Sequence, residues 1–480
     1  MKNTIFKNAI FKSILNICNI FIPLIVGTYI TRTLDIEIFG LYNSVQAQFE
    51  ILLLLGGFGI YNYGVREISF AKNNKDLSEK LFTELFIIGI LTNLFFGILL
   101  IIFTVIYTTG TERIIYMILS LQFVGNIISV EWINEANENY RIITIKTLLV
   151  RIIYIFAIFC FVKNSYDIVP YTVIMTIIYI LNNLFSFIYV INTKSLNFKK
   201  ISLKKHMKPL IIVFIFTNIG LLYSQVDKIM LGIYSSNVSV SIYQIPTYIV
   251  GIITSLTASI VVVSIPRLSH IHHNESIENY KVLLMKTINS YLFLLVPAIF
   301  GMIVLAREII LLYGGIEYID CTIPLVCAAL ISIPNAYNYI TGNLILFICG
   351  KEKQLTIINL CGGVFHIILN FLLLFFKIFN VTNVILCLGI SYCFVSIISY
   401  IYIKYKLKFK PRIMYKSVIL YFVASILFIP ISLIIKSSIA NLYLSVFITV
   451  ISCFSLYAII MAIFKENIFI MICQKLRLVK

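Results

Sequence analysis

Residues 82–107 read FTELFIIGILTNLFFGILLIIFTVIY, and Glu84 is the one charged side chain among them. About 18 or more apolar residues in a row can cross the ~30 Å hydrocarbon core of a bilayer as a helix. The run is continuous and does not alternate between apolar and polar residues, as a strand of a membrane barrel would. Because backbone groups in lipid must be bonded internally, the stretch predicts a membrane-spanning helix.

Similar runs recur through the 480 residues, of which 60% are hydrophobic and 12% charged, with a mean hydropathy of +0.99. Soluble domains carry about 25% charged residues. We therefore expect an all-α integral membrane protein with about fourteen transmembrane helices and little chain outside the bilayer. The expected spans are 13–31, 44–64, 82–107, 114–130, 142–162, 168–192, 209–234, 241–265, 287–306, 322–349, 355–376, 382–403, 415–435 and 440–464.

The lysines and arginines alternate between the two sides of these spans. With the N-terminus in the cytoplasm, 30 of the 38 fall in cytoplasmic segments, including 131–146, and six fall in outer segments. Positive charge concentrates on the cytoplasmic side of membrane proteins, so this pattern predicts that both termini are cytoplasmic. The formal net charge of +18 is then explained by anionic lipid headgroups, and no nucleic-acid partner is expected.

The two most basic loops, 193–208 and 404–416, hold six lysines and arginines each, and each follows a block of six predicted spans. Both blocks start on the cytoplasmic side, which predicts a parallel repeat related by a pseudo-two-fold axis along the membrane normal. Two such lobes leave a central cavity that opens alternately to either side as one lobe rocks against the other. The predicted organisation is an N-lobe (1–192), a basic cytoplasmic linker (193–208), a C-lobe (209–403), and a basic loop with a final helix pair and a cytoplasmic tail (404–480).

Two ionisable residues lie near the middle of predicted spans, Arg151 in 142–162 and His366 in 355–376. A charge at the bilayer centre costs about 2.5–3.5 kcal/mol, so such residues usually face a cavity or a partner. We hypothesise that they face each other across the cavity, with Arg151 as a fixed charge and His366 as a titratable one. The alternatives are an arginine bonded to backbone carbonyls and a packed neutral histidine.

Three more ionisable residues lie near the outer ends of spans. Asp227 and Lys228 are neighbours in span 7, and neighbours in a helix do not face each other. Glu50 in span 2 lies at a similar depth and is a candidate partner of Lys228. Glu84 lies near the cytoplasmic end of span 3, where we expect its side chain to reach the headgroups.

Enzyme and metal chemistry are not expected. Residues 270–273 read HIHH in a predicted cytoplasmic loop, with acids nearby only at Glu275 and Glu278 and no cysteine. That ligand set is a poor one for zinc, so we expect no metal site. No GxxxxGK[ST] motif occurs. The predicted loops also leave no room for a soluble catalytic domain, and no cofactor is expected.

Four stretches carry a family likeness. They are YITRTL (29–34) with FGLY (39–42), FGI (58–60) with YGVREI (63–68), EW (131–132) with ENYR (138–141), and DKIMLG (227–232) with PRLS (266–269). In order and spacing they resemble the polysaccharide (O-antigen type, Wzx) flippases of the multidrug/oligosaccharidyl-lipid/polysaccharide exporter superfamily. The third stretch departs from the family's usual Asp-Trp and Lys endings, which leaves the role of that loop open.

The resemblance implies a V-shaped, two-lobe transporter in the bacterial cytoplasmic membrane. Its substrate would be an oligosaccharide repeat unit on undecaprenyl pyrophosphate, flipped to the outer leaflet for surface polysaccharide biosynthesis. Implied partners are this lipid-linked glycan, membrane lipids, a polysaccharide polymerase complex and a coupling ion, H⁺ or Na⁺.

An anionic pyrophosphate needs cationic partners when it leaves water, and arginine suits it well. Arg66 and Arg267 sit where a headgroup would enter from the cytoplasmic leaflet, although both also fit as ordinary positive-inside anchors. The headgroup-binding candidates are Arg32, Arg66, Arg151, Lys228 and Arg267. The ion-coupling candidates are Glu50, Asp227 and His366.

Four other functions are weighed against this one. A flippase for the peptidoglycan lipid precursor would need the same spans and the same basic residues, so the sequence separates it poorly from the first choice. A drug or cation antiporter of the same superfamily should favour buried acids, whereas the intramembrane residues here are more often basic. A polysaccharide polymerase or ligase needs a sizeable outer loop, and the longest one, about 307–321, is short. A channel should show a short re-entrant segment.

Overall fold

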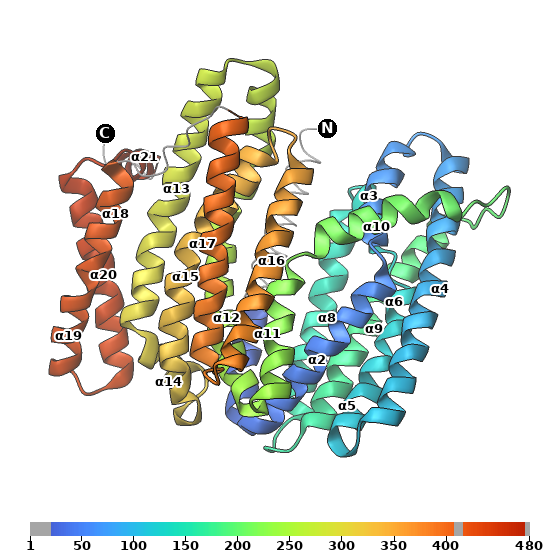
Figure 1. Cartoon of the computed structure of the whole chain (residues 1–480), viewed down its shortest axis with the longest axis horizontal. Helices are drawn as coiled ribbons and strands as arrows, with labels where there is room; N and C mark the ends of the chain where they lie inside the picture. Colours follow the sequence, from blue (N-terminus) through green and yellow to red (C-terminus); the bar gives the residue numbers. More distant parts are fainter. Residues whose placement is uncertain (1–20, 408–415, 476–480) are drawn as a thin grey trace. The chain divides into compact units, whose positions relative to one another are not determined.

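The computed structural model describes residues 21–407 and 416–475, and the chain divides into two compact units, Met1–Ser241 and Ile242–Lys480 (Figure 1). All regular structure in the described residues is helical. The first unit holds a helix over 21–33, α2 (Ile36–Gly57), α3 (Ile60–Phe70), α4 (Lys75–Tyr107), α5 (Gly110–Ser120), α6 (Gln122–Ile127), α7 (Glu131–Ala136), α8 (Tyr140–Phe161), α9 (Ile168–Thr193), α10 (Lys204–Asn218) and α11 (Leu221–Tyr234).

The second unit begins within α12 (Asn237–Asn274). It continues with α13 (Ile277–Val304), α14 (Ala306–Tyr313), the 3-10 helix η1 (Ile316–Cys321), α15 (Thr322–Ile340), the π-helix η2 (Thr341–Leu346), α16 (Glu352–Phe375), α17 (Val381–Lys406), α18 (Lys416–Ile426), α19 (Phe428–Ser438), α20 (Leu442–Ile463) and α21 (Asn467–Lys475).

The predicted membrane-spanning architecture is confirmed in the described residues. Twelve helices there are long and apolar enough to cross a membrane, and a bent pair would make a thirteenth. Each predicted span from 44–64 onward coincides with one of these helices or with the bent pair. The first predicted span, 13–31, lies partly outside the described residues, so the total of fourteen stays a prediction.

The prediction that residues 266–286 form a loop is wrong. Helix α12 continues to Asn274 and α13 already begins at Ile277, so most of this segment is helical and residues 270–273 lie on α12. A span boundary drawn from hydropathy falls where polar residues begin, whereas the backbone remains helical beyond that point. In the described part of the chain, no group of three or more His, Cys, Asp or Glu side chains could hold a metal ion.

The predicted seventh span, 209–234, is not one straight helix. Its first half belongs to α10, which starts earlier at Lys204, and the axes of the two halves meet at 72°. Figure 1 draws α10 across the direction of α4 and α8, which belong to the same unit. A hydropathy window could not show this bend because both halves are apolar.

Two further spans of the first unit are interrupted. In the second span, α2 ends at Phe58 with φ +46° and α3 starts after Gly59 with φ +73°. A Cβ at Gly59 would also lie 3.0 Å from the backbone nitrogen of Phe214, so glycine suits both the left-handed backbone and the close approach. The fourth span consists of three short helices, α5, α6 and α7.

The first unit has two hydrophobic clusters, one on each side of these interruptions. The cluster around Tyr42, Phe49 and Tyr116 joins α2, α4, α5, α6, α8 and α9 with the helix over 21–33. The other, around Phe82 and Trp132, joins α3, α4, α7 and the first turns of α10. The break between α2 and α3 and the break between α6 and α7 thus lie between two separately packed regions.

Glycine in the YGVREI stretch lets α3 approach α7. A Cβ on Gly64 would lie 2.5 Å from Cε3 of Trp132, whose side chain is 2% exposed. We expect Gly64→Ala to destabilise the protein by about 1–3 kcal/mol, because an overpacked core must shift backbone or side chains. The measurement is the thermal midpoint of the purified protein in detergent. Gly301→Ala is the control, because a Cβ there meets nothing within 4 Å, and an equal loss in both variants would contradict the prediction.

In the second unit, the helices of the final predicted pair pack against α13. Lys436 on α19 forms an ion pair with Glu308 on α14 at 2.7 Å. On α18, the hydroxyl of Tyr421 donates a hydrogen bond to Glu466 at 2.7 Å. The first contact ties the last two spans to the rest of the unit, and the second joins α18 to the segment that follows α20.

Candidate functional site

A pocket of about 430 Å³, part of which is open to solvent, lies where the second and fourth spans of the first unit are interrupted. Irregular backbone at membrane depth is tolerated where it is buried in protein or lines a cavity. Polar side chains and large apolar ones both line the pocket. The lining is Gly57, Ile60, Tyr61, Leu85, Phe86, Gly89, Asn93, Asn126, Ile127, Ser129, Val130 and Trp132.

Amide and hydroxyl groups hold the interrupted ends of the helices beside this pocket. The side-chain nitrogen of Asn126 donates to Oδ1 of Asn93 at 2.8 Å and to the Leu53 carbonyl at 3.1 Å. The hydroxyl of Thr92 donates to the Gly56 carbonyl at 2.6 Å. Gly56 belongs to the last turn of α2, whose carbonyls have no partner within the helix. The polar groups of α4 and α6 therefore stabilise the end of α2.

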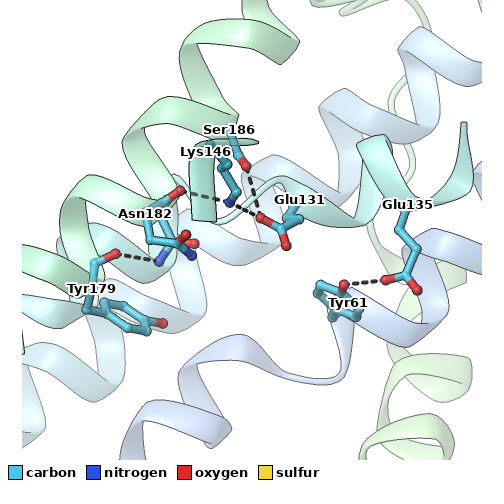
Figure 2. A network of polar contacts seen from close by, with 8 residues as sticks. Tyr61, Glu131, Glu135, Lys146, Tyr179, Asn182 and Ser186 are labelled. Carbon is cyan, nitrogen blue, oxygen red and sulfur yellow. Dashed lines mark hydrogen bonds and ion pairs between the residues drawn. The ribbon is translucent and has the colours of Figure 1, made fainter. Parts of the chain in front are cut away.

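Helix α7, which contributes Trp132 to the pocket lining, also takes part in an ion pair whose lysine is buried (Figure 2). Nζ of Lys146 on α8 pairs with Glu131 on α7 and donates to the Asn182 carbonyl of α9 at 3.0 Å. The hydroxyl of Ser186 donates to the same carboxylate oxygen at 3.1 Å. Lys146 lies on α8 and its side chain is 6% exposed, so the prediction that it belongs to a loop is wrong. The side of the membrane on which this end of α8 lies stays a prediction.

Tyr61 and Glu135 connect the pocket to α7. The hydroxyl of Tyr61, a lining residue on α3, donates to the Glu135 carboxylate (Figure 2). Two carboxylates on α7, Glu131 and Glu135, thus reach different neighbours, Lys146 toward α8 and Tyr61 toward α3. Sequence reasoning identified residues 131–132 as part of a family-like stretch but not these partners.

A second buried polar chain links α3, α4 and α10. The hydroxyl of Tyr63 is 2.9 Å from Nδ1 of His206, and Nε2 of His206 is 3.0 Å from Glu84. Lys205 pairs with the same carboxylate at 2.8 Å, and the backbone nitrogen of Ser202 donates to its other oxygen at 2.8 Å. Glu84 is completely buried, so the expectation that it reaches the headgroups is wrong. Its partners, more than 115 residues later, hold the basic linker against α4.

Among the predicted site residues, the structure brings Glu50 and Lys228 close together. Their opposite charges interact, and Glu50 also accepts hydrogen bonds from Gln46 at 3.0 Å and from Gln225. The expected proximity of Glu50 and Lys228 is therefore present between α2 and α11. Asp227, the neighbour of Lys228, is completely buried. Roles of these residues in headgroup binding or ion coupling stay predictions.

The three candidate arginines of the first unit differ in environment. Arg151 is half-buried near the middle of α8, whereas Arg32 is exposed at the end of the helix over 21–33. Arg66 on α3 is exposed, lies 5.3 Å above the ring of Tyr63, and pairs with its neighbour Glu67 at 2.9 Å. An exposed pair of this kind is weak, so the Arg66 guanidinium can exchange Glu67 for another anion.

The remaining two candidates belong to the second unit. Arg267 is exposed on α12, and His366 is completely buried on α16, with Nε2 3.3 Å from the side-chain nitrogen of Asn370. Arg151 and His366 thus lie in different units. Their proposed pairing across a cavity stays a prediction.

Solved structures with this arrangement of helices are membrane transporters. The lipid II flippase MurJ in an inward closed conformation superposes with a TM-score of 0.72 and 16% identity, over 96% of this chain and 99% of that one. An inward-facing multidrug resistance MATE family transporter of the MOP superfamily superposes with a TM-score of 0.59 and 12% identity, over 83% of this chain and 98% of that one. The fold therefore places the chain in the class of multi-pass membrane proteins that share this arrangement of helices.

Within this class, the chain belongs to the polysaccharide biosynthesis protein family, whose model matches residues 5–272. A protein of Escherichia coli (strain K12) named "Putative O-antigen transporter" is 24% identical over 55% of this chain and 64% of its own length, so this alignment spans less than two thirds of that protein. A Shigella dysenteriae protein of the same name is 24% identical over 77% of this chain and 93% of its own length.

Proposed function

We propose that this protein is a flippase that moves undecaprenyl-pyrophosphate-linked oligosaccharide repeat units from the cytoplasmic to the outer leaflet. Membership of the polysaccharide biosynthesis protein family, on a fold similar to that of a lipid flippase, carries the proposal. Movement would proceed by alternating access between the two predicted lobes. The product would serve surface polysaccharide biosynthesis.

The cationic residues of the described chain support an anionic lipid headgroup as the ligand. Arg66 is exposed and only weakly paired, and Lys228 and Arg151 lie within helices long enough to span a membrane or bent to do so. Guanidinium and ammonium groups bind phosphate strongly when water is excluded. We propose that the five candidate basic residues contact the pyrophosphate at successive stages of its passage.

The energy for transport would come from an ion gradient or from consumption of the product outside. In this proposal, Glu50, Asp227 and His366 bind or release the coupling ion, H⁺ or Na⁺. Membrane lipids and a polysaccharide polymerase complex are the proposed partners. The proposed location is the bacterial cytoplasmic membrane, with both termini in the cytoplasm.

Deletion in the native host tests the function. We expect surface polysaccharide to fall at least about tenfold while lipid-linked repeat units accumulate in the cytoplasmic leaflet, because synthesis continues when flipping stops. Surface polysaccharide and lipid-linked intermediates are measured separately, and a plasmid copy of the gene should restore both. Unchanged polysaccharide with altered dye efflux would instead indicate a drug antiporter.

Structural similarity to a lipid II flippase over nearly the whole chain favours one second candidate, a flippase for the peptidoglycan precursor. The same deletion distinguishes the two. Loss of viability, with peptidoglycan precursor accumulating in the cytoplasmic leaflet, would support this candidate and overturn the first. Viable cells that lack surface polysaccharide would reject it.

A further inference from the structure

Helix α10 has one face that packs against the first unit. His206 is 2% exposed and Leu210 is fully buried, and Val213 packs against the same hydrophobic cluster. These positions are four and three residues apart, so they share one side of the helix. That side is held by the buried chain from Tyr63 through His206 to Glu84.

The opposite face of α10 is exposed and changes in character along its length. Lys204 and Lys208, one turn apart, are exposed near its start. Ile211 and Ile215 continue the same stripe and are 44% and 46% exposed. A stripe that begins with lysines and continues with isoleucines fits the boundary between lipid headgroups and acyl chains, where lysine keeps its charge in the polar layer.

The direction of α10 agrees with this boundary. Its axis bends by 72° from the next helical segment, and Figure 1 draws it across α4 and α8, which are long enough to span a membrane. The start of α10 lies beside Glu84, close to the N-terminal end of α4, which is one of the helices long enough to span a membrane. Amphipathic helices at a membrane surface bind through their apolar face and through basic residues attracted to anionic lipids.

The start of α10 also lacks a compensating negative charge of its own. Leu203 precedes the helix and makes no side-chain cap, and the first turn has no acidic residue. Lysines at a helix N-terminus oppose the helix dipole, and a phosphate there would compensate both the dipole and the lysines. Lys205 is already paired with Glu84 at 2.8 Å, so Lys204 and Lys208 are the lysines left for such a contact.

The linker before α10 is fastened to α4. The backbone nitrogens of Asn197 and Ser202 donate to Thr83 and Glu84, each at 2.8 Å. Lys194 is hydrogen-bonded to Ser78, and burial lowers the pKa of Lys194 below its usual value. The exposed face of α10 is therefore positioned by the protein itself before any lipid binds.

We propose that the start of α10 lies at the membrane surface and binds the headgroups of anionic phospholipids through Lys204 and Lys208, with Ile211 and Ile215 among the acyl chains. The inference goes beyond the proposed flippase activity, and its test does not use transport. It identifies the resident bilayer, and not only the transported lipid, as a ligand of this protein.

Native mass spectrometry of the full chain in detergent, titrated with phosphatidylglycerol or phosphatidylcholine, tests the proposal. A lysine near an anionic surface contributes about 1 kcal/mol, about fivefold in affinity, so Lys204→Gln/Lys208→Gln should weaken phosphatidylglycerol binding by about 30-fold. Phosphatidylcholine binding should not change. Lys204→Arg/Lys208→Arg should retain binding, and an unchanged thermal midpoint in phosphatidylcholine shows that each variant is folded.

The matched control is Lys72→Gln/Lys75→Gln, which removes the same charge from two exposed positions, one in the turn after α3 and one at the start of α4. It should retain phosphatidylglycerol binding. An equal loss in the control would show that only net charge matters and would overturn the proposal, as would full binding by the Lys204→Gln/Lys208→Gln variant.

Inorganic diphosphate distinguishes a lipid site from a free phosphate site. If it displaces the lipid while Ile211→Ser/Ile215→Ser leaves lipid binding unchanged, the proposal also fails.

Discussion

Replacing Lys146 with methionine should lower the free energy of unfolding by about 3–5 kcal/mol, the range measured when one partner of a buried ion pair is removed. Methionine fills much of the lysine volume, so the loss comes mainly from the Glu131 carboxylate, which would keep Ser186 but lose its opposite charge. Because Glu131 is 20% exposed, water can solvate it in part, and we expect the lower end of the range. The measurement is the thermal midpoint of the monodisperse protein in detergent.

A double variant separates the ion pair from simple packing. Glu131→Gln/Lys146→Met carries no buried charge at this position and should recover most of the lost stability, because a neutral pair needs no compensation. Lys163→Met, at an exposed position between α8 and α9, is the control and should behave like wild type. If Lys146→Met alone keeps the wild-type midpoint, the pair does not stabilise the packing of α7, α8 and α9.

Replacing Arg151 with alanine should reduce surface polysaccharide about 10- to 100-fold in a deletion strain complemented with the variant. A hydrogen bond to a charged group contributes about 1.5–3 kcal/mol, and a pyrophosphate that passes the middle of α8 would lose such bonds. Arg151→Lys should keep part of the activity, because lysine keeps the charge but not the paired donors of a guanidinium. The measurements are surface polysaccharide and lipid-linked intermediates, both normalised to the amount of protein in the membrane.

Arg141 provides a control on the same helix. It is exposed in the first turn of α8, and Arg141→Ala should leave the polysaccharide level unchanged. Wild-type transport by Arg151→Ala at a normal protein level would reject a role of Arg151 in headgroup binding. The amount of protein in the membrane fraction separates a loss of function from misfolding, because a misfolded variant is missing from that fraction.

Much of the span pattern was predictable. The segment 82–107 lies within α4, and 440–464 coincides closely with α20. The free energy of transferring a segment into lipid is a sum over its neighbouring residues, so a window of sequence is enough to detect a span. The same window misplaced Lys146, because the polar and apolar residues around it give no sign that α8 begins at Tyr140 and turns this lysine inward.

The candidate site was predictable only in part. Glu50 and Lys228 were matched by depth along two spans, and their charges do interact. The chain from Tyr63 to His206 and Glu84 was not found, since His206 lies in a linker and Glu84 near a span end, where both resemble solvent-exposed residues. Only the fold brings together positions separated by 122 and 143 residues.

The stretch 82–107, with its neighbours of similar hydropathy, was sufficient to establish a helical membrane protein, because the cost of placing backbone and charge in lipid depends on composition alone. The order of a few motifs was sufficient to indicate the family. Tertiary structure decided where the second, fourth and seventh spans are interrupted, and which buried charges are paired. Those features depend on backbone direction at single residues such as Phe58 and Gly59, and on partners far apart in the chain, and neither contributes to a local sum of hydropathy.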